Sequence, residues 1–213
     1  MKSLFKTGDS TGGSRGENAN RVPRHSSGWK DLLQHLRSPE SLRILDIGPT
    51  SSTNINYITG LGHSVYMANL VEEAAKPEWM KSLNPGEPPV FDVEGFIATN
   101  LSFDGRNFDV VIFWDTADYL PEVLVPAVFD RIHKVMQPGG RILAFFHIKA
   151  TGPETEFCRY HLTDTDVVDM QRAGNFPLLH TYSNRQIENF FSAFSNYRFF
   201  LAKDNLREVI VTR

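Results

Sequence analysis

The sequence predicts a doubly wound α/β fold, in which helices cover both faces of a mostly parallel β-sheet and an antiparallel β-hairpin ends the chain. Short apolar runs alternate with segments whose apolar residues have helical spacing, which is the pattern of strands alternating with helices. The connections are short, so successive strands are expected to lie parallel and to be joined by right-handed crossovers. Two final apolar runs lie close enough to pair as the hairpin.

Strands are expected at apolar runs bounded by turn residues, and helices where apolar residues recur three and four positions apart. The run FDVVIFW (108–114) is the clearest strand, and the single apolar stripe of residues 125–136 marks the clearest helix. A polar stretch at about 148–182 interrupts the alternation. In chain order the expected elements are helix 29–36, strand 42–47, helix 53–60, strand 63–68, an irregular stretch 71–95 with a short helix around 73–83, strand 108–114, helix 125–136, strand 141–147, helix 184–194 and the hairpin of strands 197–202 and 208–212.

Length and composition indicate one globular domain. The chain has 213 residues, of which 41% are hydrophobic and 22% are charged, which allows one sizeable core and not two domains of ordinary size. Apolar runs are too short to cross a bilayer, and the amino terminus lacks an apolar signal region. Cys158 is the one cysteine, which excludes an internal disulfide. We expect a cytoplasmic protein that does not contact a membrane.

The first segment differs in composition from the rest. Residues 1–27 are rich in glycine, serine, asparagine and arginine, with almost no periodic apolar signal. Such a segment buries too little surface to offset the entropy of ordering it. We therefore predict a flexible tail over residues 1–27 and a single domain over residues 28–213. A tail that closes over a bound cofactor is the alternative.

Three sequence segments and the terminal hairpin together resemble the class I S-adenosylmethionine-dependent methyltransferases. The segments are RILDIGP (43–49), LSFDGRNFDVVIF (101–113) and VMQPGGRILAFFH (135–147), and they occur in the family's order and spacing. The resemblance covers roughly residues 42–213. It implies a seven-stranded sheet in three α/β/α layers. It also implies S-adenosylmethionine as the cofactor, bound at the carboxyl ends of the strands, where doubly wound sheets hold ligands.

The resemblance assigns the methionine end of the cofactor to Asp46, whose carboxylate would attract the ammonium and sulfonium groups. The alternative is that Asp46 only fixes the turn after its strand. Gly48 has no Cβ, so a ligand can approach its backbone closely. The other expected cofactor contacts are Pro49, Thr50, Asn54, Asn69, Leu70, Asn100, Leu101 and Trp114.

Several positions depart from the family's pattern. Thr50 and Ser52 replace the second and third glycines of the glycine-rich loop. Asn69 stands where an acid usually bonds both ribose hydroxyls, and Asn100 is the nearest polar candidate for a missing acid at the adenine. A neutral amide forgoes charge-assisted hydrogen bonds, which are about twice as strong as neutral ones. A catalytically silent protein that keeps the fold as a binding or interaction module is therefore the alternative to a methyltransferase.

Candidates for a proton-accepting group follow two strands at the ligand-binding edge. Asp115 and Tyr119 come after strand 108–114, and His147 ends strand 141–147; a histidine titrates near neutral pH. A solvated turn for Asp115 and a structural role for His147 are the alternatives. Trp114 suits stacking on adenine or an acceptor, or packing in the core. Tyr160 and His161, in the polar stretch, are candidates for the wall of an acceptor pocket.

Charge and composition limit the partners. The formal net charge is −3, and a nucleic-acid-binding domain would need a basic excess. The seven histidines are scattered, so no metal site is expected. The fingerprint G-x-G-x-x-G of nicotinamide-dependent enzymes is absent after the first strand. We expect a small-molecule methyl acceptor, and Phe199 and Phe200 leave a homodimer open.

Overall fold

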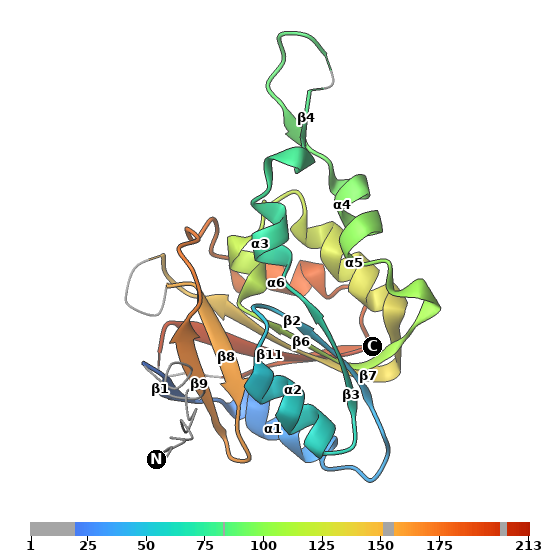
Figure 1. The fold of residues 1–213 in the computed structure, drawn as a ribbon, viewed down its shortest axis with the longest axis vertical. Helices are drawn as coiled ribbons and strands as arrows, with labels where there is room; N and C mark the ends of the chain where they lie inside the picture. Colours follow the sequence, from blue (N-terminus) through green and yellow to red (C-terminus); the bar gives the residue numbers. More distant parts are fainter. Residues whose placement is uncertain (1–19, 83, 151–155, 201–203) are drawn as a thin grey trace, which may run out of the picture.

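The computed structural model describes residues 20–82, 84–150, 156–200 and 204–213 (Figure 1). It confirms the predicted doubly wound α/β fold with its terminal antiparallel hairpin. The central sheet has the order β10-β11-β7-β6-β2-β3. Four of its strands are parallel, while β11 is antiparallel to both β7 and β10. The strands are β2 (Arg43–Ile47), β3 (Ser64–Ala68), β6 (Phe108–Trp114), β7 (Met136–His147), β10 (Asn196–Phe200) and β11 (Leu206–Thr212).

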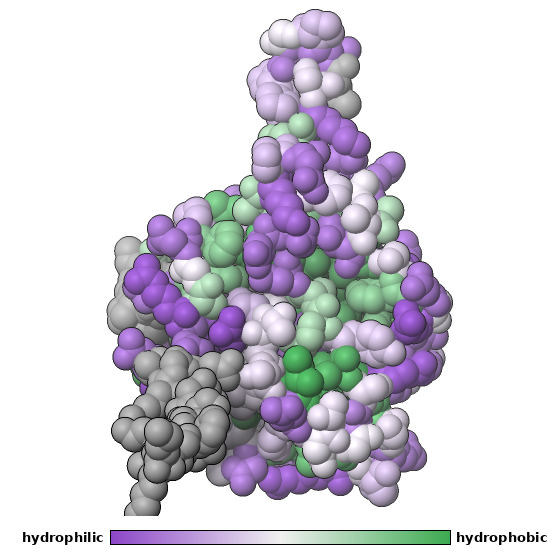
Figure 2. All heavy atoms as spheres, viewed as in Figure 1, coloured by the Kyte–Doolittle hydropathy of each residue, from purple (hydrophilic) through white to green (hydrophobic). Residues whose placement is uncertain are grey.

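The described residues give this sheet six strands, one fewer than predicted. Between β3 and β6 the chain instead forms the antiparallel pair β4 (Met80–Lys81) and β5 (Val90–Phe91), which belongs to neither larger sheet. This pair lies in an arm that projects from the top of Figure 1, and the spheres at the arm's outer end are mostly purple to white in Figure 2. Little apolar surface is available there to join a buried parallel sheet.

The helix predicted around residues 73–83 is wrong in its position. Helix α3 occupies Leu70–Ala74 and is followed by a 3₁₀ turn at Pro77–Trp79. Pro77 accounts for the break, because a proline disfavours helical backbone in the residue before it, and Lys76 is extended. The structure then forms α4 at Val93–Asn100, a helix that the proline-rich composition of the stretch did not predict.

One face of the sheet is covered by two helices and a smaller sheet. Helices α1 (Ser27–Leu36) and α2 (Ser52–Gly60) pack on it, beside an antiparallel sheet of order β1-β9-β8 (Figure 1). The polar stretch predicted at 148–182 therefore contains a hairpin. Part of the predicted tail is also ordered, because β1 pairs with β9; residues 1–19 lie outside the described part of the chain. The smaller sheet comprises β1 (Val22–His25), β8 (Cys158–Leu162) and β9 (Val167–Arg172).

The other face packs against α3, α4, α5 (Val125–Val135) and α6 (Asn184–Phe190). Alternation along β6 divides its side chains between the two cores. Val111 and Phe113 belong to the core under α3–α6, whereas Ile112 and Trp114 belong to the core under α1, α2 and β8. Trp114 thus ends β6 on the side of the smaller sheet. Within the described ranges, no helix has the length and apolarity to span a membrane.

Candidate functional site

Asp46 lies near the carboxyl end of β2, and its carboxylate is closed off from solvent. The residue is 1% exposed. Its Oδ1 accepts a hydrogen bond from Nε1 of Trp114 at 2.7 Å, and its Oδ2 accepts one from Nδ2 of Asn54 at 3.0 Å. Burial raises the pKa of Asp46 to about 6, although the two hydrogen bonds oppose that rise. Both carboxylate oxygens are therefore bound within the protein.

The indole of Trp114 fills the space beside Gly48. A Cβ on Gly48 would lie 3.0 Å from Cδ1 of Trp114, so the absence of that atom leaves room for the indole. The indole stacks on the ring of Tyr160, with centroids 4.8 Å apart and planes 7° apart. Both aromatic residues are buried. Trp114 has φ +48°, a left-handed backbone conformation that is strained for a bulky residue.

Two polar residues of the loop and helix after β2 tie this region to β8. The hydroxyl oxygen of Ser51 accepts a hydrogen bond from the backbone amide of Asn54 and lies 2.9 Å from Nδ1 of His161. Asn54 donates from Nδ2 to the carbonyl of Tyr160 at 3.0 Å and accepts at Oδ1 from the amide of Leu162 at 2.8 Å. Strand β8 is therefore hydrogen-bonded to the start of α2 at three successive residues.

Tyr160 also reaches the residue that follows β6. Its hydroxyl donates to Oδ2 of Asp115 at 2.8 Å, and Asp115 is 1% exposed. Burial raises the pKa of Asp115, while nearby His147 and the bond from Tyr160 lower it. These contacts join the ends of β2 and β6 to β8 in one group, the strand-end cluster. Its members are Asp46, Asn54, Trp114, Asp115 and Tyr160.

His147 ends β7 next to this cluster, and Asp118 holds it in place. The backbone amide and Nδ1 of His147 both donate to Oδ2 of Asp118, at 2.6 and 2.8 Å. On the other side, Nε2 of His147 lies 4.0 Å from Oδ2 of Asp115. Burial raises the pKa of Asp118 to about 6, although its bonds with His147 lower it. The imidazole therefore lies between two buried carboxyl groups.

The three residues predicted as proton acceptors lie together. The ring of Tyr119 meets the imidazole of His147 edge to face at a centroid distance of 5.9 Å, and Asp115 lies on the imidazole's Nε2 side. Burial raises the pKa of the Tyr119 phenol above its ordinary value. A phenol with a raised pKa stays protonated near neutral pH, so Tyr119 is the least suited of the three to accept a proton there.

Two predicted cofactor contacts have local partners in their own helices. Asn69 caps α3, where its Oδ1 accepts the amide of Glu72 and its Nδ2 donates to that residue's carboxylate. Asn100 donates from Nδ2 to the carbonyl of Phe96 within α4. Their assignment to ribose and adenine stays a prediction.

The other predicted contacts divide between core and surface. Leu70 and Leu101 are buried in the core under α3–α6. Pro49 is half-buried and Thr50 is exposed in the loop after β2. Ser51 is the buried hydroxyl residue of this loop, and it was not named as a candidate site residue from the sequence.

Sequence reasoning did not select Asp118, and it assigned Tyr160 and His161 only to an acceptor pocket. The alternation of Cys158, Tyr160 and Leu162, which are all buried, could have predicted a strand with these side chains on one face. No sequence signal indicates that Tyr160 stacks on an indole. Nor does any signal indicate that Asp118 contacts a histidine distant in the chain.

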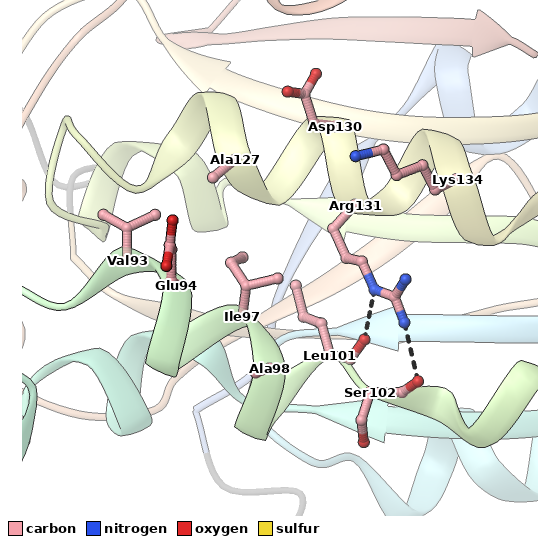
Figure 3. A pocket seen from close by; sticks show the side chains of 10 residues that line it. All are labelled: Val93, Glu94, Ile97, Ala98, Leu101, Ser102, Ala127, Asp130, Arg131 and Lys134. Atoms are coloured by element: carbon pink, nitrogen blue, oxygen red, sulfur yellow. Dashed lines mark hydrogen bonds between the residues drawn. The ribbon is translucent and has the colours of Figure 1, made fainter.

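A cavity of about 420 Å³ lies between α4 and α5 (Figure 3). We call it the α4–α5 groove. Arg131 crosses one end of it and donates to the carbonyls of Leu101 and Ser102. Two further cavities lined by described residues have volumes of about 310 and 330 Å³. None of these three is lined by a residue of the strand-end cluster.

Comparison with known proteins gives one family match. A family model described as a methyltransferase domain matches residues 22–195. No curated protein sequence matches the chain.

Solved methyltransferase structures resemble the fold at low sequence identity. TehB from Haemophilus influenzae is 12% identical, with a TM-score of 0.49; the match covers 86% of this chain and 61% of TehB. A SAM-dependent methyltransferase from Methanosarcina mazei is 14% identical, with a TM-score of 0.48 and coverage of 85% and 96%. One from Bacteroides fragilis, in complex with S-adenosyl-L-homocysteine, is 15% identical, with a TM-score of 0.45 and coverage of 85% and 76%. Likenesses this weak assign no substrate.

Proposed function

Because the chain belongs to the S-adenosylmethionine-dependent methyltransferase family, we propose that it transfers a methyl group from S-adenosylmethionine to a small-molecule acceptor. The observation that carries the proposal is the family match over residues 22–195. That range contains the parallel strands and the residues Asp46 and Gly48 at the end of β2. A net charge of −3 favours a small molecule over a nucleic acid as acceptor.

In the conformation of this structure, the residues at the end of β2 do not fit the cofactor. Both oxygens of Asp46 accept hydrogen bonds from the protein itself. The indole of Trp114 occupies the space that Gly48 leaves, and Tyr160 covers the indole. The proposed reaction therefore requires a conformation in which this space is empty.

An oxygen or nitrogen acceptor must lose a proton, and we assign Asp115 and His147 as the groups that can take it. Burial raises the pKa of Asp115, which brings this carboxylate closer to the basicity that proton transfer near neutral pH needs. Asp118 fixes the orientation of His147 through two hydrogen bonds. Both candidates are almost fully buried, so they too would act only in an opened site.

Titration calorimetry with S-adenosylmethionine and S-adenosylhomocysteine tests the proposal. We expect measurable heat and a raised melting temperature, because a ligand that binds only the folded protein at 100 times its Kd stabilises it by about 2.7 kcal/mol. Absence of both signals at millimolar ligand would rule out this function for the native chain.

The filled space favours a second candidate function, a catalytically silent binding or interaction module. The double variant Thr50→Gly with Asn69→Asp restores two residue types that the family's pattern has. If the native chain ignores the cofactor and this variant binds it, loss of the original activity is supported. If neither the native chain nor the double variant binds the cofactor, the residues at positions 50 and 69 are not what prevents binding, because Trp114 and Tyr160 are still present in both proteins.

A further inference from the structure

We propose that β8 is a removable plug: the ring of Tyr160 closes the cofactor cleft over Trp114, and ligand enters when β8 moves away. This inference rests on the proposed function, because it describes how the same site opens. It is drawn from the mismatch between a family whose ligands bind at the strand ends and a chain whose own aromatic side chains occupy that place.

The contacts that hold the plug are both apolar and polar. Cys158, Tyr160 and Leu162 of β8 pack in the core under α1, α2 and β8, and this packing favours the closed state. The polar contacts lie beside it. Tyr160 is bound to Asp115 through its hydroxyl and to Asn54 through its carbonyl. His161 contacts the hydroxyl of Ser51, and the amide of Leu162 donates to Asn54. Polar groups like these can exchange their partners for water when the strand moves, so opening does not leave them unsatisfied.

Strand β8 is also part of a sheet that is separate from the central one. It pairs with β9 over Cys158–Leu162, and β9 pairs with β1 over Val22–His25. All of these pairings are antiparallel and internal to the smaller sheet. The buried guanidinium of Arg24 in β1 pairs with Glu208 of β11, so β1 is anchored to the central sheet. The movement that opens the cleft is therefore a displacement of β8 against α2 and the end of β6, which need not break its ladder with β9.

Backbone strain lies at the contact that the plug covers. Trp114 has φ +48°, and the pairing of β6 with β7 shifts register between Ile112 and Trp114. A strained conformation of this kind persists only where surrounding contacts enforce it, and strained residues concentrate at switch regions and binding sites. The stack with Tyr160 and the bond to Asp46 are two such contacts. Loss of the stack would let Trp114 relax away from Gly48.

The plug sets the affinity for ligand through the fraction of molecules that are open. If only that fraction can bind, the apparent Kd equals the intrinsic Kd divided by the open fraction. Substitutions that weaken the closed state alone must then tighten binding. Tyr160→Phe is such a substitution, because it keeps the stacked ring and removes the hydroxyl that satisfies the buried carboxylate of Asp115.

Calorimetric titration with S-adenosylhomocysteine of the full chain and four variants tests the proposal. Tyr160→Phe weakens the plug, and Tyr160→Ala removes its ring. Tyr182→Phe and Tyr182→Ala are the matched controls. Tyr182 is 3% exposed, against 2% for Tyr160, and belongs to the core on the opposite face of the sheet. The controls therefore cause similar losses of buried atoms away from the cleft.

We expect Tyr160→Phe to lower the apparent Kd about tenfold, the factor for one hydrogen bond to a charged group, and Tyr160→Ala to lower it further. The Tyr182 variants should bind as the native chain does. If Tyr160→Ala does not fold, Tyr160→Phe alone decides. A native chain without detectable binding and a Tyr160→Phe variant with it would also support the plug.

Two results would overturn the plug, and they differ in what they mean for the proposed function. If the native chain and Tyr160→Phe bind with equal affinity, the site is a cofactor site without a plug. If no variant binds, the plug is wrong and the silent candidate is favoured.

Discussion

The strand-end cluster and the α4–α5 groove differ in how the space between their side chains is filled. The cluster contains or adjoins the residues that carry the family resemblance, and it is filled by aromatic rings and internal hydrogen bonds. The groove is lined by Leu101 and Ser102 of the resembling segment 101–113 but by no residue of the strand-end cluster, and it is a cavity of about 420 Å³. A motif can therefore fix where the backbone turns toward a ligand without fixing what occupies the space beside that turn.

Physical differences between the two regions explain the contrast. Buried polar groups in the cluster need partners, so each side chain there is held by several others. Small and aliphatic side chains such as Ala98 and Ala127 line the groove, and charged residues such as Lys134 lie along it (Figure 3). Long charged side chains can keep their ends in water, so this lining requires little mutual contact. The cluster should therefore be sensitive to substitution and the groove tolerant.

Trp114→Ala should have the largest effect. It removes a fully buried indole together with the donor to Asp46, and replacing a buried tryptophan by alanine costs about 3–5 kcal/mol. Lys134→Ala, in the groove, should change the free energy of unfolding by less than about 0.5 kcal/mol. Urea denaturation of both variants measures the contrast, and a similar small loss in each would remove it.

The pH dependence of stability should identify Asp46 as a buried acid. Its pKa of about 6 in the folded chain exceeds the ordinary value of 3.8, so the folded state binds more protons between these values. Its contribution to the free energy of unfolding is therefore present below pH 4 and is lost as pH rises through 6, by up to about 3 kcal/mol.

Asp46→Asn removes this titration. The free energy of unfolding of the native chain, minus that of the variant, should fall between pH 4 and pH 7. Urea denaturation at several pH values in this range measures the difference. Asp118, whose pKa is also raised to about 6, remains in both proteins and so cancels. A difference that stays constant or grows with pH would mean that Asp46 is not buried as an acid.

Arg131→Ala should give an intermediate loss of stability without affecting the strand-end cluster. The guanidinium holds the carbonyls of Leu101 and Ser102 at the end of α4, and Arg131 is partly exposed. We expect a loss of about 1 kcal/mol and unchanged affinity for S-adenosylhomocysteine. A large change in affinity would show that the groove and the strand-end cluster are coupled.

Asn69→Asp should have the smallest effect. Aspartate preserves the helix cap, but it lies next to the carboxylate of Glu72, so we expect a loss below about 0.5 kcal/mol. If the plug limits binding, this variant gains less affinity for S-adenosylhomocysteine than Tyr160→Phe does. The reverse order of affinities would make the missing acid the limiting factor.

The sequence predicted the elements with strong periodicity and missed those set by tertiary context. The apolar run that forms β6 and the stripe of residues 125–136 identified their strand and helix well. The arm between β3 and β6 was not predicted, because proline and glycine there indicate where an element breaks and not which elements form between the breaks. The site shows the same limit: Asp115 and His147 were selected because they end strands, whereas the partners of Tyr160 and Asp118 depend on how distant segments pack.

A crystal structure of the full chain soaked with S-adenosylhomocysteine would show whether β8 moves when ligand binds. We expect ligand beside Gly48, with the ring of Tyr160 displaced from Trp114 and the hydrogen bond between Trp114 and Asp46 broken. Ligand bound at the end of β2 while the two rings remain stacked 4.8 Å apart would contradict this expectation.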